Sequence, residues 1–382
     1  MTDLHALTRA TAELDPPLAA LDLAALDANA ADLVRRAGAK PVRIASKSVR
    51  CRWVLDRALA LSGVRGVMAY SLREAIWLVR NGTADVLMGY PSVDRAAFAE
   101  LADPTLAAAI TVMIDDAAQV RWIRQAAPGV PVRVCLDVDA SLRIGRVHLG
   151  VRRSPIRTPE QAVAVAAAAD TAGLRVVGVM FYEAQIAGLQ DTSPAVRLMK
   201  KRSAAELARR RGSVVQAVEK VVGALEIVNS GGTGSLEVSS ADESVTEVSA
   251  GSGLFVPGLF DGYDAFDARP ALYFALPVVR RPAPDIATLF GGGYIASGPA
   301  GKSRLPRIAT PGLELLGPEG AGEVQTPVRG PGAAELQVGD RVWFRHAKAG
   351  ELGERFDVIH VVRDGAVIQS VPTYRGEGKT FG

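Results

Sequence analysis

Residues 176–181 read Val-Val-Gly-Val-Met-Phe, a nearly continuous apolar run that ends in the polar pair Tyr182-Glu183. Stretches with helical spacing, rich in Ala, Leu and Arg, alternate with runs of this kind along the chain. Strands without polar alternation are typical of parallel sheets, because helices cover both of their faces. The run therefore predicts one strand-helix unit of a parallel sheet.

The same unit occurs eight times between about residues 42 and 255. The apolar runs cover residues 42–47, 66–71, 85–90, 109–115, 132–139, 174–182, 224–230 and 247–252. Eight strands that alternate with eight helices predict an α/β fold, a closed (β/α)8 TIM barrel. An open doubly wound sheet is the alternative.

The sequence changes character after residue 270, where prolines, glycine clusters and alternating apolar runs replace the helical stretches. Asp364-Gly365 separates two such runs, and this dipeptide is a strong signal for a tight hairpin turn. We therefore expect a β-rich C-terminal domain at residues 271–382 and a barrel at 25–270. A short N-terminal segment, residues 1–24, is expected to pack on the β domain.

The composition excludes several classes of partner. The chain has 382 residues, of which 44 are basic and 41 acidic, and a net charge of +3 gives no electrostatic signature for nucleic acid or an anionic membrane. The longest apolar run, at 162–169, is far shorter than the roughly 18 to 20 residues of a membrane span, and the polar start lacks a signal peptide. We expect a cytoplasmic protein in which Cys51 and Cys135 are core thiols.

A basic stretch at residues 191–220 interrupts the pattern between the sixth and seventh runs. We interpret it as one solvated helix face, with an anion or partner site as the alternative. Its basic residues are Lys200, Lys201, Arg202, Arg209, Arg210 and Arg211.

Chemistry in barrels of this type lies at the carboxyl ends of the strands, and Lys47 ends the first run. The chain has only 8 lysines against 36 arginines, so surface usage does not explain a lysine there. We expect its amine to be partly desolvated, which favours the neutral form that attacks a carbonyl to make a Schiff base. A lysine that only reaches the rim is the alternative.

Two glycine-rich turns follow the seventh and eighth runs, Asn229-Ser-Gly-Gly-Thr-Gly234 and Ser249-Ala-Gly-Ser-Gly253. Loops at these positions often bind phosphate through backbone N–H groups, although ordinary turns also use glycine. A phosphate site together with a carbonyl-trapping lysine suggests pyridoxal 5'-phosphate (PLP).

The order of the motifs resembles that of the fold-type III PLP-dependent enzymes, whose barrel is like the N-terminal domain of alanine racemase. Within them the chain is most similar to the D-threonine aldolase and D-serine dehydratase branch, over roughly residues 20–376. The motifs are Arg43-Ile-Ala-Ser-Lys47, Asp137-Val-Asp-Ala-Ser-Leu-Arg143-Ile-Gly145, Gly178-Val-Met-Phe-Tyr182-Glu183, the two glycine turns, and His346-Ala-Lys348.

The resemblance implies roles for these positions. Lys47 would hold PLP and later act as acid and base at the substrate Cα. Arg143 would contact the phenolic oxygen or neighbouring substrate groups, and Tyr182 would lie beside the ring. His346 would reach the substrate β-hydroxyl, and a homodimer is implied. The phosphate would be bound by Ser230, Gly231, Gly232, Thr233, Gly251 and Ser252.

Two departures from the family pattern stand out. Ala184-Gln185 replaces the family's Gly-His after the tyrosine, so an imidazole is missing there. Lys348 stands where the family has its second metal ligand, and an ammonium cannot coordinate a divalent ion, so we predict no metal site. We hypothesise that Lys348 stabilises a developing oxyanion instead. The alternative is that Lys348 is solvent-exposed and that activity is lost or redirected.

The resemblance implies a PLP-dependent lyase acting on a small β-hydroxy D-amino acid, by retro-aldol cleavage or by dehydration and deamination. An amino acid racemase is one alternative, with Tyr273, Tyr294 and Tyr374 as candidates for its second base. A non-catalytic PLP-binding protein is the other.

Overall fold

The computed structural model describes residues 2–267, 269–348 and 350–382. The chain divides into two compact units. The sheet unit comprises Met1–Asp32, Ser48–Asp56 and Ser252–Thr380, and the barrel unit comprises Leu33–Lys47, Arg57–Gly251 and Phe381–Gly382. The domain boundaries expected at residues 25 and 271 stay a prediction.

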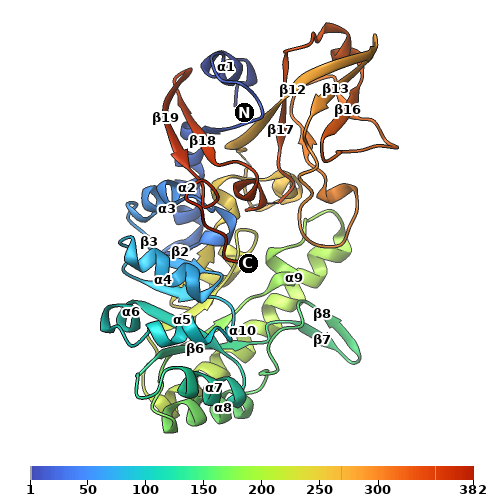
Figure 1. Cartoon of the computed structure of the whole chain (residues 1–382). Helices are drawn as coiled ribbons and strands as arrows, with labels where there is room; N and C mark the ends of the chain where they lie inside the picture. Colours follow the sequence, from blue (N-terminus) through green and yellow to red (C-terminus); the bar gives the residue numbers. More distant parts are fainter. Residues whose placement is uncertain (1, 268, 349) are drawn as a thin grey trace. The chain divides into compact units, whose positions relative to one another are not determined.

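The barrel unit contains eight parallel strands that close in the order β10-β11-β2-β3-β4-β5-β6-β9 (Figure 1). Each strand overlaps one of the eight predicted runs, so the closed barrel is confirmed and the open sheet is wrong. The strands are β2 (Val42–Ala45), β3 (Val64–Ala69), β4 (Val86–Met88), β5 (Ile110–Ile114), β6 (Arg133–Val138), β9 (Arg175–Phe181), β10 (Ile227–Ser230) and β11 (Glu247–Ala250).

Helices connect the strands, and local sequence fixes where several of them begin. Asp116 and Thr158, for example, cap α7 and α8 in reciprocal capping boxes with Gln119 and Gln161. The helices of the connections are α3 (Arg52–Leu59), α4 (Leu72–Arg80), α5 (Arg95–Glu100), α6 (Pro104–Ala109), α7 (Ala117–Ala126), α8 (Pro159–Thr171), α9 (Ala184–Ala187), α10 (Pro194–Val222) and α11 (Leu236–Ser240), and α2 (Leu23–Ala37) precedes β2.

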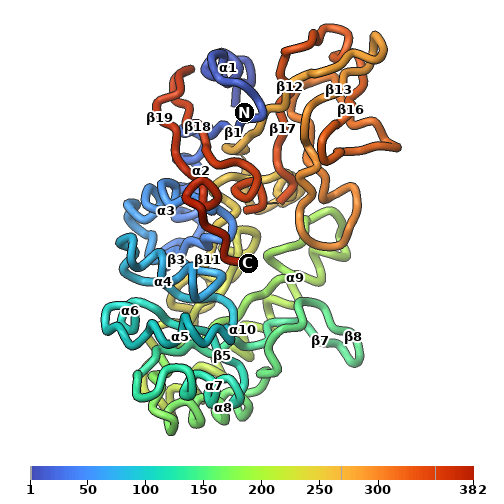
Figure 2. The backbone as a smooth tube through the Cα atoms, viewed as in Figure 1, coloured from blue at the N-terminus to red at the C-terminus, as the bar shows by residue number. Residues whose placement is uncertain are grey.

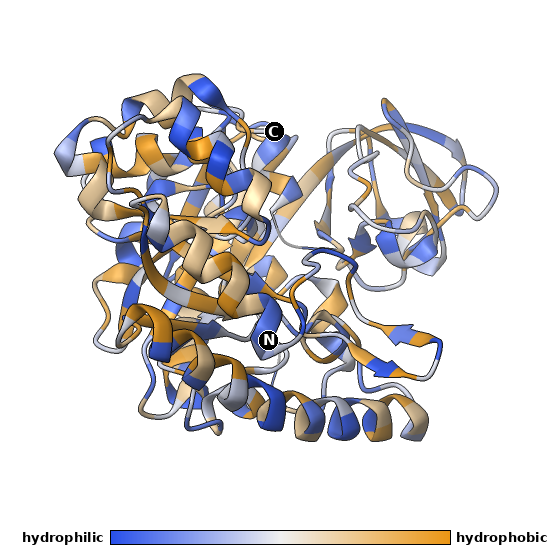
Figure 3. Ribbon diagram, turned by 90° about the horizontal axis from the view of Figure 1, so that it is seen from below, coloured by the Kyte–Doolittle hydropathy of each residue, from blue (hydrophilic) through white to orange (hydrophobic). Residues whose placement is uncertain are grey.

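Apolar side chains fill the interior of the barrel, where Cys135 packs with Leu87, Met113 and Val177. Cys51 and Cys135 are both buried and free, as predicted. In Figure 3 hydrophobic and hydrophilic residues alternate along the helices. Among the described residues, no helix has both the length and the apolar character that a membrane span requires.

The basic stretch forms the long helix α10, but the prediction of one solvated face is wrong for two of its residues. Lys200 is buried and forms an ion pair with Asp191 at 2.7 Å. Arg211 is buried and forms an ion pair with Asp242. Paired charges can be buried, and a charge count along the sequence does not reveal the pairing.

The sheet unit is built on a nine-stranded sheet in the order β15-β16-β13-β12-β1-β18-β19, with β17 paired to β12 and β14 to β17. The strands are β1 (Leu18–Asp22), β12 (Leu272–Ala283), β13 (Ile286–Phe290), β14 (Arg307–Ile308), β15 (Glu314–Leu315), β16 (Gln325–Arg329), β17 (Arg341–Arg345), β18 (Val358–Arg363) and β19 (Ala366–Pro372). The hairpin predicted at Asp364-Gly365 joins β18 to β19, and both residues have positive φ, 51° and 78°.

The N-terminal strand β1 is part of this sheet, antiparallel to β12 and parallel to β18. Figure 2 shows this first segment of the chain beside the red hairpin near its end. The helix α1 (Leu4–Ala10) contributes Leu7 to a core with Trp343 and Tyr273. Short 3-10 helices complete the chain, namely η1 (Ser46–Ser48), η2 (Ser252–Leu254), η3 (Gly258–Gly262), η4 (Lys302–Arg304), η5 (Pro331–Glu335) and η6 (Glu351–Glu354).

A charged group lies inside the barrel where its first and last strands meet. Arg43 on β2 is fully buried and donates to Glu247 on β11 at 2.6 Å and to Asp85, next to β4, at 2.9 Å. Burial alone would lower the pKa of Arg43, but the two carboxylates outweigh it and raise the pKa. The ion group thus links three strands of the barrel.

We predict that Arg43→Met lowers the free energy of unfolding by about 3–5 kcal/mol, because it leaves the buried Glu247 carboxylate without its partner. Urea denaturation followed by circular dichroism measures the change. Arg65→Ala is the matched control, because exposed Arg65 lies 3.5 Å from the same Asp85, and we expect a loss below about 1 kcal/mol. Equal stability of the Arg43→Met variant and the wild type would contradict a structural role for this ion group.

Candidate active site

Lys47 lies just beyond the carboxyl end of β2, in the 3-10 turn η1. Its amine donates a hydrogen bond to the hydroxyl of Tyr90 at 2.9 Å. Tyr90 follows β4, so two strands bring these side chains to the same end of the barrel. The side chain of Lys47 is exposed, and the expected partial burial is wrong because the turn carries it past the apolar end of the strand.

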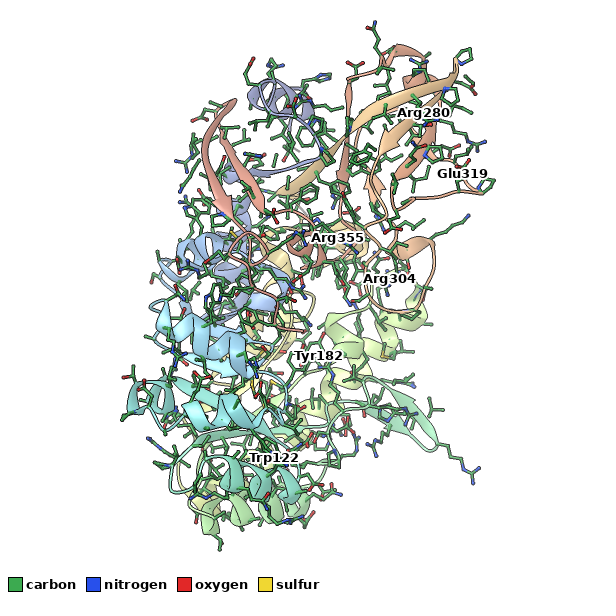
Figure 4. All side chains as sticks on the ribbon, viewed as in Figure 1. Trp122, Tyr182, Arg280, Arg304, Glu319 and Arg355 are labelled. Carbon is green, nitrogen blue, oxygen red and sulfur yellow. The ribbon has the colours of Figure 1, made fainter. Side chains whose placement is uncertain are left out.

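Arg153 joins Tyr90 to Tyr182 by lying over both rings. Its guanidinium carbon is 5.4 Å from the ring centroid of Tyr90 and 5.2 Å from that of Tyr182, which are cation–π distances. Tyr182, labelled in Figure 4, follows directly on β9. Lys47, Tyr90, Arg153 and Tyr182 therefore form one cluster, which we call the mouth cluster.

The two tyrosines of the mouth cluster differ in acidity. Burial raises the pKa of Tyr182 to about 12, and the nearby Tyr90 adds to this. Burial also acts to raise the pKa of Tyr90, but the positive charges of Lys47 and Arg153 outweigh it and lower the pKa. Tyr90 is thus the more acidic phenol of the two.

Arg143 makes a different set of contacts from Arg153. It lies on the hairpin of β7 (Leu142–Ile144) and β8 (Val147–Leu149), which the strand pattern did not predict. Its guanidinium forms an ion pair with Asp139 at 2.7 Å, and 44% of its side chain is exposed. The role in cofactor binding expected for Arg143 stays a prediction.

Asp137, near the end of β6, is a buried acid beside this cluster. Burial raises its pKa to about 7, the negative charge of Asp115 adds to the shift, and Arg153 opposes it. An acid with this pKa changes its charge near neutral pH.

The glycine turn after β10 is shaped by close packing. A Cβ at Gly232 would lie 2.7 Å from the Cβ of Ala187 and 3.5 Å from the Tyr182 ring, so only glycine fits there. Arg36 donates to the carbonyl oxygen of Thr233 at 2.7 Å. The hydroxyl of Ser230 and the N–H of Gly231 both donate to Glu183. These two donors are therefore engaged within the protein.

Of the remaining predicted site residues, Gly251 belongs to the barrel unit, and Ser252, His346 and Lys348 belong to the sheet unit. His346 follows β17 and is buried, and neither ring nitrogen has a hydrogen-bond partner. Burial lowers its pKa to about 3, and Arg345 adds to the effect, so the imidazole is neutral at physiological pH. Lys348 donates to the hydroxyl of Ser297 at 3.1 Å, and the Ser252 hydroxyl lies 3.3 Å from that of Ser48.

The donor set does not fit a divalent metal ion. Within the described ranges, His, Cys, Asp and Glu side chains form no group of three or more that could hold one. The ammonium of Lys348 carries no lone pair for a metal, and His346 alone is too few ligands. No step of the mechanism is therefore derived through a metal.

The tyrosines considered for a racemase belong to the sheet unit as well. Tyr374 is completely buried, and Tyr273 is 5% exposed. Burial raises the pKa of Tyr273 and that of Tyr294. A buried phenol of raised pKa is a poor second base.

Sequence reasoning missed Tyr90, Arg153 and Glu183. Tyr90 closes the third apolar run, and the rule that selected Lys47 also selects Tyr90. Glu183 follows the sixth run in the same way. Arg153 had no such signal, because it lies beyond an unpredicted hairpin.

Comparison with known proteins identifies the family of this barrel. The family model of the alanine racemase N-terminal domain matches residues 21–257. The chain belongs to this family. A D-threonine aldolase from Arthrobacter sp is 28% identical over 291 residues, which cover 74% of this chain and 72% of the relative.

Two solved structures of similar fold cover nearly the whole chain. A D-threonine aldolase from Filomicrobium marinum has a TM-score of 0.82 at 23% identity and covers 96% of both chains. The D-threo-3-hydroxyaspartate dehydratase from Delftia sp. HT23 has a TM-score of 0.74 at 22% identity, and the match covers 94% of this chain and 97% of the other. The similarity of fold thus includes the C-terminal sheet as well as the barrel.

We predict that Asp137→Asn becomes more stable relative to the wild type as the pH rises from about 4 to 7. Between the unfolded pKa of about 3.9 and the folded pKa of about 7, the folded wild type holds more protons than the unfolded chain, so its stability falls with pH. The slope is at most about 1.4 kcal/mol per pH unit. Urea denaturation at several pH values measures it.

Asp139→Asn is the control of opposite sign. Burial alone would raise the pKa of Asp139, but hydrogen bonds from Ser141 and the charge of Arg143 lower it. The wild-type carboxylate therefore stabilises the fold above its unfolded pKa, and Asp139→Asn should be less stable at neutral pH. Parallel pH profiles of wild type and Asp137→Asn would contradict the raised pKa of Asp137.

Proposed function

We propose that this chain is a PLP-dependent lyase that acts on a β-hydroxy D-amino acid, by retro-aldol cleavage or by dehydration and deamination. The observation that carries the proposal is the amine of Lys47 at the carboxyl end of β2, within a barrel of the alanine racemase family. One relative is named a D-threonine aldolase, and one structure of similar fold is named a D-threo-3-hydroxyaspartate dehydratase. Both names denote β-hydroxy D-amino acid substrates.

The residues of the barrel unit fit PLP in two respects. Lys47 offers an exposed primary amine to an aldehyde. Gly232 lets the turn after β10 pass close to Tyr182 and Ala187. Its N–H donates to Ser235 and that of Gly231 donates to Glu183, so the proposed phosphate contacts lie beyond these two donors. We keep Thr233, Gly251 and Ser252 as proposed phosphate contacts, and Ser230 and Gly231 as residues that shape the turn.

When bound, PLP would delocalise the electron pair left at the substrate Cα. Lys47 would hold the cofactor and move the proton at Cα, with Tyr90 within hydrogen-bond distance of its amine. Arg153, whose guanidinium lies on the rings of Tyr90 and Tyr182, would bind an anionic oxygen of the cofactor or substrate. We propose this role for Arg153 in place of Arg143.

His346 and Lys348 are proposed to act on the substrate oxygens. The low pKa of His346 keeps its imidazole neutral, so its lone pair would accept a hydrogen bond from the β-hydroxyl. Lys348 would supply positive charge at the position where the family resemblance implies a metal ligand. The homodimer and the cytoplasmic location stay predictions.

We predict that Lys47→Ala abolishes the visible absorbance of bound PLP and lowers turnover by roughly 10²–10⁴-fold, because the amine proposed to hold the aldehyde is removed. Turnover is measured with D- and L-threonine, serine and 3-hydroxyaspartate. Aldehyde and glycine report aldol cleavage, and ammonia with a keto acid reports dehydration. Lys201→Ala, at an exposed position of α10, is the control and should behave as wild type.

Other outcomes of the same assays decide between the alternatives. Exchange between D and L enantiomers without cleavage would favour a racemase, and bound PLP without turnover of any substrate would favour a binding protein. Turnover that survives dialysis against EDTA supports the proposal for Lys348, and turnover that is lost and then restored by a divalent ion overturns it.

We predict that Arg153→Ala lowers kcat/KM by about 10²-fold, because a guanidinium that binds a reacting oxygen is lost, while Arg143→Ala lowers it less than about threefold. Steady-state kinetics on the substrate identified above measure both values. The PLP content of both variants, read from absorbance, should stay near that of the wild type. A larger loss for Arg143→Ala would return the role to Arg143.

A further inference from the structure

Glu183 is a completely buried acid for which the proposed mechanism has no use. It directly follows Tyr182 and precedes α9, yet its side chain makes no capping hydrogen bond to that helix. Its carboxylate instead points toward the segment after β10. A buried carboxylate is costly unless donors surround it, so this placement requires an account.

Four donors surround the Glu183 carboxylate. Oε2 accepts from the hydroxyl of Ser230 at 2.9 Å and from the N–H of Gly231 at 3.2 Å. Oε1 accepts from the hydroxyls of Ser235, at 2.7 Å, and Ser239. Both carboxylate oxygens of Glu183 are therefore occupied by donors of the protein itself.

All four donors come from one short segment, residues 230–239, which contains the glycine turn. Gly231 has a φ of 96°, in the left-handed region, and its N–H is fixed by Glu183 in that conformation. The hydroxyl of Ser235 also accepts from the N–H of Gly232 at 3.1 Å. One carboxylate therefore holds both glycines of the turn, directly or through a single serine.

Two buried guanidinium groups hold the same segment. Arg211 donates to the hydroxyl of Ser230 at 2.9 Å, and Arg36 donates to the carbonyl oxygen of Thr233 at 2.7 Å. Each is also paired with an acid, Asp242 and Glu237 respectively. The turn is thus fixed by three buried charged side chains, which is more than a surface turn needs.

We infer that Glu183 is a positioning residue for the phosphate of the cofactor: its carboxylate holds the turn at residues 230–235 in the shape that receives a phosphate. The inference rests on the proposed function. Glu183 itself does not touch the phosphate, because two anions in contact repel and its oxygens are occupied by donors. Tyr182, the residue before Glu183, lies against Gly232. Glu183 therefore also fixes the phosphate-binding turn relative to the tyrosine that is proposed to lie beside the cofactor ring.

The test compares PLP with pyridoxal, which has the same aldehyde but no phosphate. Both are titrated into the full-length chain after the cofactor is removed, and their visible absorbance gives the Kd. We expect Glu183→Ala to raise the Kd of PLP by about 10- to 100-fold, because the turn loses its acceptor, and to leave the Kd of pyridoxal unchanged.

Glu183→Gln should restore PLP binding to within about threefold of the wild type. Its amide oxygen can accept from Ser230 and Gly231, and its amide nitrogen can donate to the hydroxyls of Ser235 and Ser239, which also accept. Ser235→Ala is a milder variant if Glu183→Ala does not fold, and we expect a several-fold weaker binding of PLP alone, since one of the four donors and the contact to Gly232 are lost.

Glu74→Ala is the matched control. Glu74 is also a completely buried glutamate of the barrel unit, but it accepts from the backbone N–H of Tyr70 at the start of α4. A merely structural role for Glu183 predicts the same change in both variants, and thermal unfolding of each reports the loss of stability separately. Glu74→Ala should keep the wild-type ratio of the two Kd values.

The outcomes separate the inference from the function on which it rests. A wild-type chain that binds neither PLP nor pyridoxal overturns both. The role of Glu183 alone is overturned if the wild type binds PLP but the ratio of the PLP Kd to the pyridoxal Kd changes no more in Glu183→Ala and Ser235→Ala than in Glu74→Ala. Loss of PLP and pyridoxal binding to the same extent would also overturn it, since the effect would then lie at Lys47.

Discussion

The barrel depends on a guanidinium in its interior. Arg43 on β2 is fully buried between Glu247 of β11 and Asp85 next to β4. Arg43 and Glu247 are each tolerable in the interior only while the other is in place, because an unpaired buried ion would cost several kcal/mol, whereas the side chain of Asp85 is 37% exposed. Since β2 and β11 are the strands that close the barrel, the ion group favours the one register in which all three charges meet.

That register determines which side chains lie together at the carboxyl ends of the strands. Arg43 and Lys47 belong to the same strand and its following turn, and fixing the first in the interior fixes the turn that carries the second. The neighbouring strands are aligned by the same pairing, so the residues after β4 and β9 come to the same end. Tyr90 and Tyr182 meet Arg153 there. The mouth cluster is therefore a consequence of barrel closure rather than of any local motif.

The strand-helix pattern predicts the barrel because apolar runs without polar alternation form strands that are buried on both faces. Asp364-Gly365 predicts a hairpin because this dipeptide favours the positive φ angles of a tight turn. Neither kind of signal records which charges pair across the fold. For this reason the prediction of a solvated helix face is wrong for Lys200 and Arg211, and no signal in the sequence indicated the contacts of Arg153. Lys47 was located correctly at the end of β2, but its exposure depends on a 3-10 turn that the apolar run does not reveal.

The departure from the family at Ala184-Gln185 follows from the same packing. Gln185 is buried, and its amide nitrogen donates to the carbonyl oxygen of Ala140 at 2.7 Å and to the hydroxyl of Ser203 on α10 at 2.6 Å. Its amide nitrogen thus ties α9 to α10, whereas its amide oxygen is buried without a hydrogen-bond partner. A cation contacts the Tyr182 ring, namely the guanidinium of Arg153. Asp137, whose pKa burial raises to about 7, is an acid beside this contact whose charge changes near neutral pH.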